Sequence, residues 1–160
     1  MTLPFLIPLE GTALRDAGVP APYALGLANK VTFSELDAFN HVNNARYLSW
    51  FETFRIAYFK ARGLGDYSDP DDKPIVVLKQ VGIDYRAPLY IEDSYVVAGR
   101  TRAFRRRSFT MEYGVWRDGT LCATSHAVIC LMEQDFVTMR ALPAKFTTTF
   151  ETMDGAVFEG

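Results

Sequence analysis

The stretch from Asn44 to Arg62 reads NARYLSWFETFRIAYFKAR, and it decides the fold of this chain. Asn43 before it is a favourable N-cap and Gly63 after it ends a helix, so the stretch predicts one helix about 28 Å long. Its apolar side chains cover most sides of a helical wheel. Such a helix is buried, so another part of the chain must wrap around it. Most of these side chains gather on one side (Tyr47, Trp50, Phe51, Phe54, Ala57, Tyr58 and Ala61), while Leu48, Ile56 and Phe59 lie elsewhere.

The segments around this helix have the composition of β-strands. Residues 23–34 precede it, with 31–33 as their clearest part, and four longer segments follow it. Asp118-Gly119 predicts a hairpin turn between the last two segments, and successive hairpins indicate an antiparallel sheet. The sequence therefore predicts an α+β fold in which a curved antiparallel sheet wraps around one long central helix. The four later segments are 74–86, 90–104, 108–116 and 120–133.

The length of 160 residues suits a single domain, which we place at residues 24–142. Residues 1–23 are interrupted by Pro and Gly and predict a covering arm with one short helix at 9–17. Residues 143–160 predict a tail with at most one short helix, which begins at a proline.

The composition excludes several classes of protein. A net charge of −2 argues against a nucleic-acid binder. The sequence has no run of 18 apolar residues, which a membrane-spanning helix would need. Cys122 and Cys130 lie in one predicted strand, roughly 26 Å apart, which is too far for a disulfide. We therefore expect buried free thiols in a reducing compartment, the cytoplasm.

The polar segment before the helix is the best candidate for chemistry. It places Asp37, His41, Asn43 and Asn44 within eight residues, between a strand and a helix start. Unpaired N–H groups at a helix start suit a developing oxyanion, and a nearby carboxylate can act as general base or nucleophile on a carbonyl. The same residue types also occur in turns and caps for local reasons, so the pattern alone leaves the interpretation open.

Residues 33–48, FSELDAFNHVNNARYL, resemble the motif of hotdog-fold thioesterases, the 4-hydroxybenzoyl-CoA thioesterase-like or acyl-CoA thioesterase group. Two later pieces agree with this group, IDYRAPL at 83–89 and DGTLCA at 118–123, and the resemblance covers about residues 28–135. It implies a hotdog fold and hydrolysis of an acyl-CoA thioester to free acid and CoA, with CoA as part of the substrate and no other cofactor.

The resemblance also implies roles for individual residues. Asp37 aligns with the loop carboxylate of the group, a base or nucleophile toward the thioester. The helix-start amide that polarises the thioester carbonyl falls near Asn44, and His41 and Asn43 match polar positions of the motif. A second hotdog class uses a glutamate on the central helix instead, where this chain has Glu52.

Several alternatives stay open. Glu52 is more simply a surface charge that faces Arg55 three residues later. The motif also resembles acyl-ACP thioesterases, and a non-catalytic acyl-CoA-binding hotdog module or a hotdog dehydratase are further rivals. The sequence does not place Ser125 and His126 in a triad. The histidines and cysteines lack the spacing of metal ligands, so we expect no metal site.

A basic run stands out in this acidic chain, and arginine makes bidentate contacts with phosphate. Similar positions in the hotdog group contact CoA, so we expect Arg106, Arg107 and Ser108 to bind the phosphates of coenzyme A or of a phosphopantetheine carrier; the alternative is a solvated turn. The run comprises Arg100, Arg102, Arg105, Arg106 and Arg107.

The hotdog resemblance further implies a homodimer or homotetramer with active sites between subunits. An exposed sheet edge fits this expectation. So does the aromatic surface of the central helix, which we expect to exceed what one small sheet covers.

Overall fold

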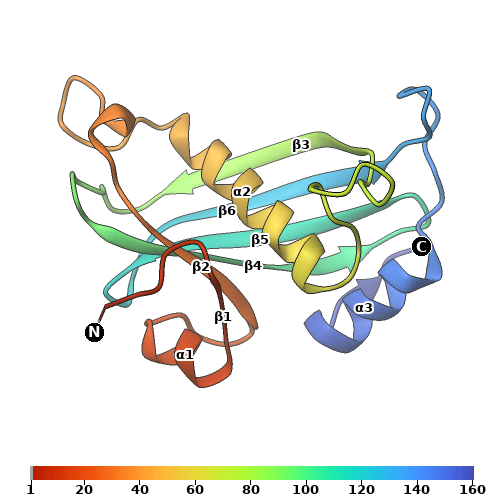
Figure 1. Cartoon of the computed structure of the whole chain (residues 1–160), viewed down its shortest axis with the longest axis horizontal. Helices are drawn as coiled ribbons and strands as arrows, with labels where there is room; N and C mark the ends of the chain where they lie inside the picture. The colour runs from red at the N-terminus through yellow and green to blue at the C-terminus, as the bar shows by residue number, and fades with distance from the viewer. Residues whose placement is uncertain (1) are drawn as a thin grey trace.

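The computed structural model of the chain describes residues 2–160. A sheet curves around one long helix, α2, and the shorter helices α1 and α3 lie beside the sheet (Figure 1). In chain order the elements are β1 (Pro8–Glu10), α1 (Gly11–Asp16), β2 (Leu25–Lys30), the 3-10 turn η1 (Phe33–Glu35), α2 (Arg46–Ala61), β3 (Val76–Tyr85), β4 (Ser94–Phe104), β5 (Ser108–Arg117), β6 (Thr120–Leu131), α3 (Ala144–Asp154) and β7 (Val157–Phe158).

The strands lie in the order β1-β2-β4-β5-β6-β3, with antiparallel neighbours, and β7 pairs in parallel with β4. β4, β5 and β6 follow one another as hairpins. The turn between β5 and β6 has Asp118 (φ 48°) and Gly119 (φ 77°) in the left-handed region that tight hairpins use. β3 does not pair with the next strand but lies at the sheet edge beside β6. The predicted α+β fold with a central helix is confirmed. Within residues 2–160, the short β7 and a single parallel bridge between Phe5 and Ala28 depart from the antiparallel pattern.

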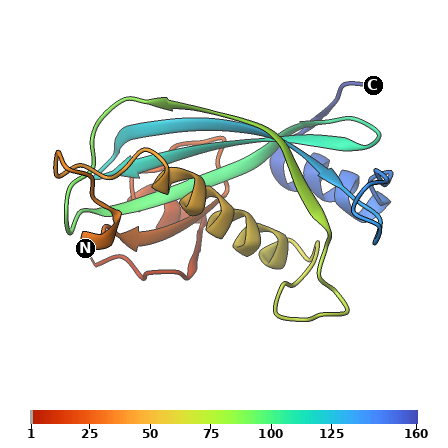
Figure 2. The same cartoon turned by 90° about the horizontal axis from the view of Figure 1, so that it is seen from above.

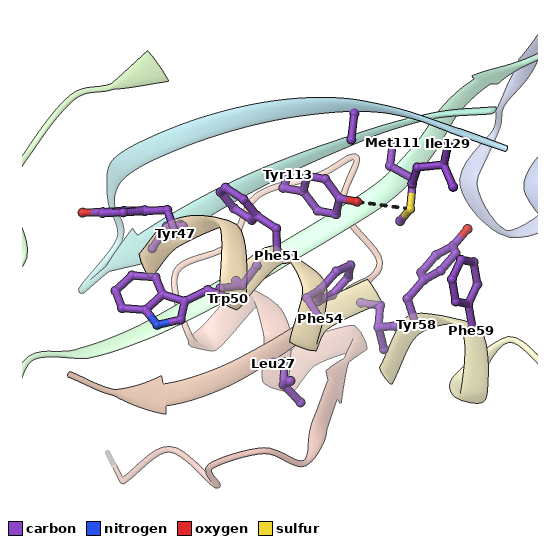
Figure 3. Close-up of a cluster of buried hydrophobic side chains, with 14 of the residues drawn as sticks. Leu27, Tyr47, Trp50, Phe51, Phe54, Tyr58, Phe59, Met111, Tyr113 and Ile129 are labelled. Atoms are coloured by element: carbon purple, nitrogen blue, oxygen red, sulfur yellow. Dashed lines mark hydrogen bonds between the residues drawn. The ribbon is translucent and has the colours of Figure 1, made fainter. Parts of the chain in front are cut away.

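α2 lies along the concave face of the sheet, as the view from above shows (Figure 2). Its aromatic side chains form the main core (Figure 3). Trp50 stacks on Tyr95 with ring centroids 4.0 Å apart, and Phe51 stacks on Tyr113 at 5.0 Å. The expectation of an exposed aromatic helix surface is wrong, because strand aromatics and α3 cover these rings. The helix aromatics Trp50, Phe51, Phe54, Tyr58 and Phe59 are each at most 7% exposed.

β2 ends earlier and α2 begins later than the sequence predicts. Residues 31–33 continue no strand, because Thr32 and Glu35 form a capping box that starts η1. The Thr32 N–H donates to Glu35 Oε1 over 2.9 Å, and the Thr32 hydroxyl donates to the same atom over 3.1 Å. Such local hydrogen bonds compete with a sheet ladder. α2 begins at Arg46, two residues after the predicted start.

Both ends of the chain pack against the sheet. β1, which the sequence did not predict, pairs with β2, and the predicted short helix follows as α1. α1 buries Leu14 in a second, smaller core that includes Trp116. α3 begins after Pro143 and buries Phe146 and Phe150 in the main core.

Cys122 and Cys130 are buried free thiols, as expected. Burial raises the pKa of both thiols, so neither is an activated nucleophile. No helix within residues 2–160 combines the length and the apolar character needed to cross a membrane.

Candidate active site

A tight loop holds Asp37 between Leu36 and Val42, which pair as an isolated antiparallel bridge. The Asp37 N–H donates to the His41 carbonyl oxygen over 2.8 Å. Asp37 Oδ1 accepts the N–H groups of Phe39 (2.8 Å) and His41 (3.3 Å). These bonds fix the orientation of the carboxylate, and within residues 2–160 its second oxygen, Oδ2, has no hydrogen-bond partner.

Glu35 fastens this loop to α2. Its Oε2 accepts the indole N–H of Trp50 over 2.6 Å, and its Oε1 accepts the N–H of Thr32. Its carbonyl oxygen accepts the N–H of Asn43 over 2.8 Å. One residue therefore joins the beginning of the loop, the end of the loop and the central helix.

Asn43 and Asn44 build the approach to α2. Asn43 Oδ1 accepts the N–H of Ala45, and the Asn43 carbonyl accepts the N–H of Arg46, each over 2.9 Å. Asn43 thus caps the turn before the helix rather than the helix itself. The Asn44 carbonyl accepts the Tyr85 hydroxyl over 2.8 Å, whereas the Asn44 N–H has no partner in the described part of the chain. A free N–H at this place is the group that an oxyanion needs.

These groups meet in one pocket of about 260 Å³. It brings together three of the four predicted catalytic residues, Asp37, His41 and Asn44, whereas Asn43 stands behind them as a capping residue. The wall formed by the end of β3 was not predicted from the sequence, although the piece at 83–89 lies there. The remaining lining residues are Val42, Tyr47, Tyr85, Arg86, Ala87 and Pro88.

The two tyrosines of the pocket, Tyr47 and Tyr85, are neutral at physiological pH. Burial raises the pKa of Tyr47 to about 12 and also raises the pKa of Tyr85. Both phenols therefore act as hydrogen-bond donors rather than bases. The half-buried His41 ring packs edge-on against Tyr90, with centroids 5.2 Å apart.

The predicted phosphate-binding residues lie at the other end of the sheet. The segment before β4 contacts the Asp37 loop, while the turn after β4 carries the arginines. The 11 residues of β4 span about 36 Å, so one chain does not bring Arg106, Arg107 and Ser108 to Asp37. Arg106 and Arg107 are exposed and Ser108 is half-buried. Arg100 is not free, because its Nε pairs with a glutamate of β5 over 2.6 Å.

Glu52 is exposed but makes no ion pair within residues 2–160, because the buried Arg55 turns inward and donates to the Tyr113 hydroxyl over 3.1 Å. The expected Glu52–Arg55 pair is therefore wrong.

Ser125 is buried and His126 exposed on opposite faces of β6, so they form no triad. The described residues contain no group of three or more potential metal ligands.

Comparison with known proteins decides the family. The model of the thioesterase-like superfamily matches residues 31–145. The chain belongs to this superfamily. Its fold is the hotdog fold, and membership supports thioester hydrolysis as the class of reaction.

Solved structures of thioesterases are similar to this chain. A thioesterase superfamily protein from Jannaschia sp. CCS1 is 40% identical, with 97% of this chain and 98% of that chain covered and a TM-score of 0.89. A thioesterase from Thermus thermophilus, complexed with coenzyme A and Zn, is 29% identical over 81% of this chain and 93% of that chain, with a TM-score of 0.71. A 1,4-dihydroxy-2-naphthoyl-CoA thioesterase from Synechocystis is 15% identical over 81% of this chain and 96% of that chain, with a TM-score of 0.71, and this likeness concerns the fold alone.

Proposed function

We propose that this superfamily member hydrolyses an acyl-CoA thioester to the free acid and coenzyme A, with Asp37 as general base or nucleophile. The observation that carries the proposal is the pocket that holds both the Asp37 carboxylate and the start of α2 at Asn44. The thioesterase from Thermus thermophilus, which binds coenzyme A, supports a CoA thioester as the substrate.

Both roles of Asp37 use its unpaired oxygen. As a base, Oδ2 takes a proton from water while the water oxygen bonds to the thioester carbonyl carbon. As a nucleophile, Oδ2 bonds to that carbon itself and forms an anhydride, which water then cleaves. In both routes the carbonyl oxygen takes up negative charge next to the Asn44 N–H, and the C–S bond breaks to release the CoA thiolate, which is then protonated. His41 and Asn43 hold the loop and the helix approach through their backbone and side-chain hydrogen bonds.

The proposal includes a second copy of the chain. Arg106, Arg107 and Ser108 bind the CoA phosphates, and their distance from Asp37 in one chain requires that they serve the site of a partner. A homodimer, alone or within a homotetramer, supplies this arrangement. The long exposed edge strand β3 supports it, and the two free cysteines fit a reducing, cytoplasmic location.

Thiol release, followed with a thiol-reactive dye, tests the proposal. One acyl group is presented as its CoA, pantetheine and acyl-carrier-protein thioester, and we expect the highest kcat/KM for the CoA thioester. Faster release from the carrier protein would favour the acyl-ACP alternative. Binding of acyl-CoA in calorimetry without thiol release would identify a non-catalytic module.

A further inference from the structure

Arg55 is a buried cation without a counter-ion. It lies in the middle of α2 and is only 9% exposed. Within residues 2–160 its guanidinium makes one hydrogen bond, from Nη1 to the Tyr113 hydroxyl, and takes part in no ion pair. Buried charges are normally paired, because removing an ion from water is costly. Arg55 therefore has donors left to bind an anion.

The groups around Arg55 do not neutralise it. Tyr113 and Tyr67 offer neutral phenols, and the exposed Glu52, one turn earlier on α2, makes no ion pair with Arg55. Ser125 lies in register beside Tyr113, on the sheet face that turns to α2, and its buried hydroxyl also lacks a partner. The Nε and Nη2 atoms of Arg55 have no hydrogen-bond partner within residues 2–160 and are not fully occluded, so they keep some contact with solvent.

An apolar strip joins Arg55 to the pocket. Leu48, 42% exposed, lies on the same side of α2 as Arg55, seven residues earlier. Opposite it, Val81 and Ile83 lie on the same face of β3 as Tyr85 because side chains alternate along a strand. The Tyr85 ring contacts α2 through Tyr47, so that face turns toward the helix, and Val81 is 36% exposed. Arg55 itself lies nine residues beyond the start of α2, about 14 Å along its axis.

Building on the proposed thioester hydrolysis, we propose that Arg55 selects the acyl group: its guanidinium binds a carboxylate at the far end of an acyl chain that runs from the pocket along this strip. The favoured substrates are thus ω-carboxyacyl thioesters. The methylene groups contact Leu48 and Val81, and the terminal carboxylate replaces the missing counter-ion. Arginine suits this task because its planar fork can bind a carboxylate with two hydrogen bonds.

Matched pairs of CoA thioesters test the selection. Glutaryl-, adipyl-, suberyl- and sebacyl-CoA are each compared with the monocarboxylic acyl-CoA of the same carbon number. In the wild type, at least one diacid thioester should exceed its partner in kcat/KM by about 10- to 100-fold, the value of a hydrogen bond to a charged group. Arg55→Met should abolish this preference, Arg55→Lys should keep part of it, and Glu52→Gln, which alters only the exposed neighbour, should preserve it.

A binding measurement separates this proposal from the reaction itself. The free diacids, as products, should raise the Tm of the wild type more than monocarboxylic acids of equal length, and should do so less in Arg55→Lys. This readout needs no turnover, so a failure of thioester hydrolysis leaves it intact. Equal kcat/KM for both members of every pair, with equal Tm shifts, would overturn the proposal. So would a change of oligomeric state in Arg55→Lys with unaltered substrate preference, because a partner's carboxylate would then be the counter-ion.

Discussion

The Tyr85 hydroxyl donates a 2.8 Å hydrogen bond to the carbonyl oxygen of Asn44 and so ties the edge strand β3 to the approach of α2. The Tyr85 ring also packs edge-on against Tyr47, with centroids 5.1 Å apart. The contact between Tyr85 and Asn44 sets the width of the candidate active site, because one wall comes from β3 and the other from the start of α2.

Tyr85→Phe should lower kcat about fivefold with little change in KM. The ring contact with Tyr47 remains, but the hydrogen bond that orients the Asn44 peptide, worth about 1 kcal/mol, is lost. Steady-state kinetics on one acyl-CoA measures the effect. Tyr23→Phe is the matched control, since Tyr23 packs on Trp116 in the second core and does not line the pocket. A raised KM with unchanged kcat in Tyr85→Phe would assign Tyr85 to substrate binding instead.

Asp37→Asn should lower kcat by about 10²- to 10⁴-fold, the usual contribution of a general base. The amide oxygen can still accept the N–H groups of Phe39 and His41, so the loop and the circular dichroism spectrum should be unchanged. Asp135→Asn is the control, because Asp135 Oδ1 also accepts two backbone N–H groups, in an exposed turn outside the pocket. Near-normal turnover in Asp37→Asn would indicate that another carboxylate, such as Glu52, carries the reaction. Glu52→Gln tests that alternative directly.

Arg106→Ala combined with Arg107→Ala should raise KM for a CoA thioester about tenfold at low salt and leave kcat nearly unchanged. Both side chains are exposed, so added salt should shrink the effect by screening. The matched pantetheine thioester lacks the nucleotide phosphates and should be unaffected. Arg86→Ala serves as the comparison within the pocket. An equal rise in KM for the CoA and pantetheine thioesters in the double variant would exclude phosphate binding by the turn after β4.

The local parts of this fold could be predicted from the sequence, and the non-local parts could not. The central helix and the Asp118-Gly119 hairpin follow from patterns within a few residues. The position of β3 depends on its pairing with the distant β6, which runs from Val76 with Leu131 to Tyr85 with Ala123, and no local pattern specifies that partner. Residues 31–33 suited a strand, but Thr32 and Glu35 formed a capping box instead.

The same distinction between local and non-local features applies to the candidate site. Asp37, His41 and Asn44 meet because one short loop carries them all. Tyr85 and Arg86 reach the pocket only through the sheet. The direction of a side chain could not be predicted from the sequence either. An arginine in a helix is typical of a surface charge, whereas the structure buries Arg55 beside Tyr113.

Asp154 should make stability depend on pH. It is buried at the end of α3 and accepts hydrogen bonds from the Thr101 N–H (2.9 Å) and the Tyr58 hydroxyl. Burial raises its pKa despite these bonds. Between the unfolded and folded pKa values the folded state binds more protons, so the Asp154 contribution to stability falls as pH rises through that interval.

Comparison with Asp154→Asn isolates this effect, because the amide keeps an acceptor but does not titrate. The Tm of the wild type minus that of the variant should decrease from about pH 4 upward. Asp135→Asn supplies a control of opposite sign, because hydrogen bonds from Thr138 and Val137 lower the Asp135 pKa. The Tm of the wild type minus that of Asp135→Asn should therefore increase with pH. A difference for Asp154→Asn that grows with pH would contradict the burial argument.

The edge strand β3 should be the dimer interface. It offers a 10-residue edge with Leu78 40% exposed, whereas the opposite edge, β1, has only three residues. The neighbouring Lys79 on this edge is already charged and exposed, so Leu78 supplies the apolar contact of this stretch, and a second charge there should oppose pairing with another strand. Leu78→Lys should therefore shift the protein toward monomer in light scattering at micromolar concentration and reduce CoA-dependent activity, since Arg106 and Arg107 serve the partner's site. Ile7→Lys, at the 58% exposed Ile7 beside β1, should change neither property. At substrate concentrations below KM, where the Arg106→Ala, Arg107→Ala double variant is impaired, mixing it with Asp37→Asn should restore part of the activity through hybrid dimers. A fully active wild-type monomer would refute the shared site.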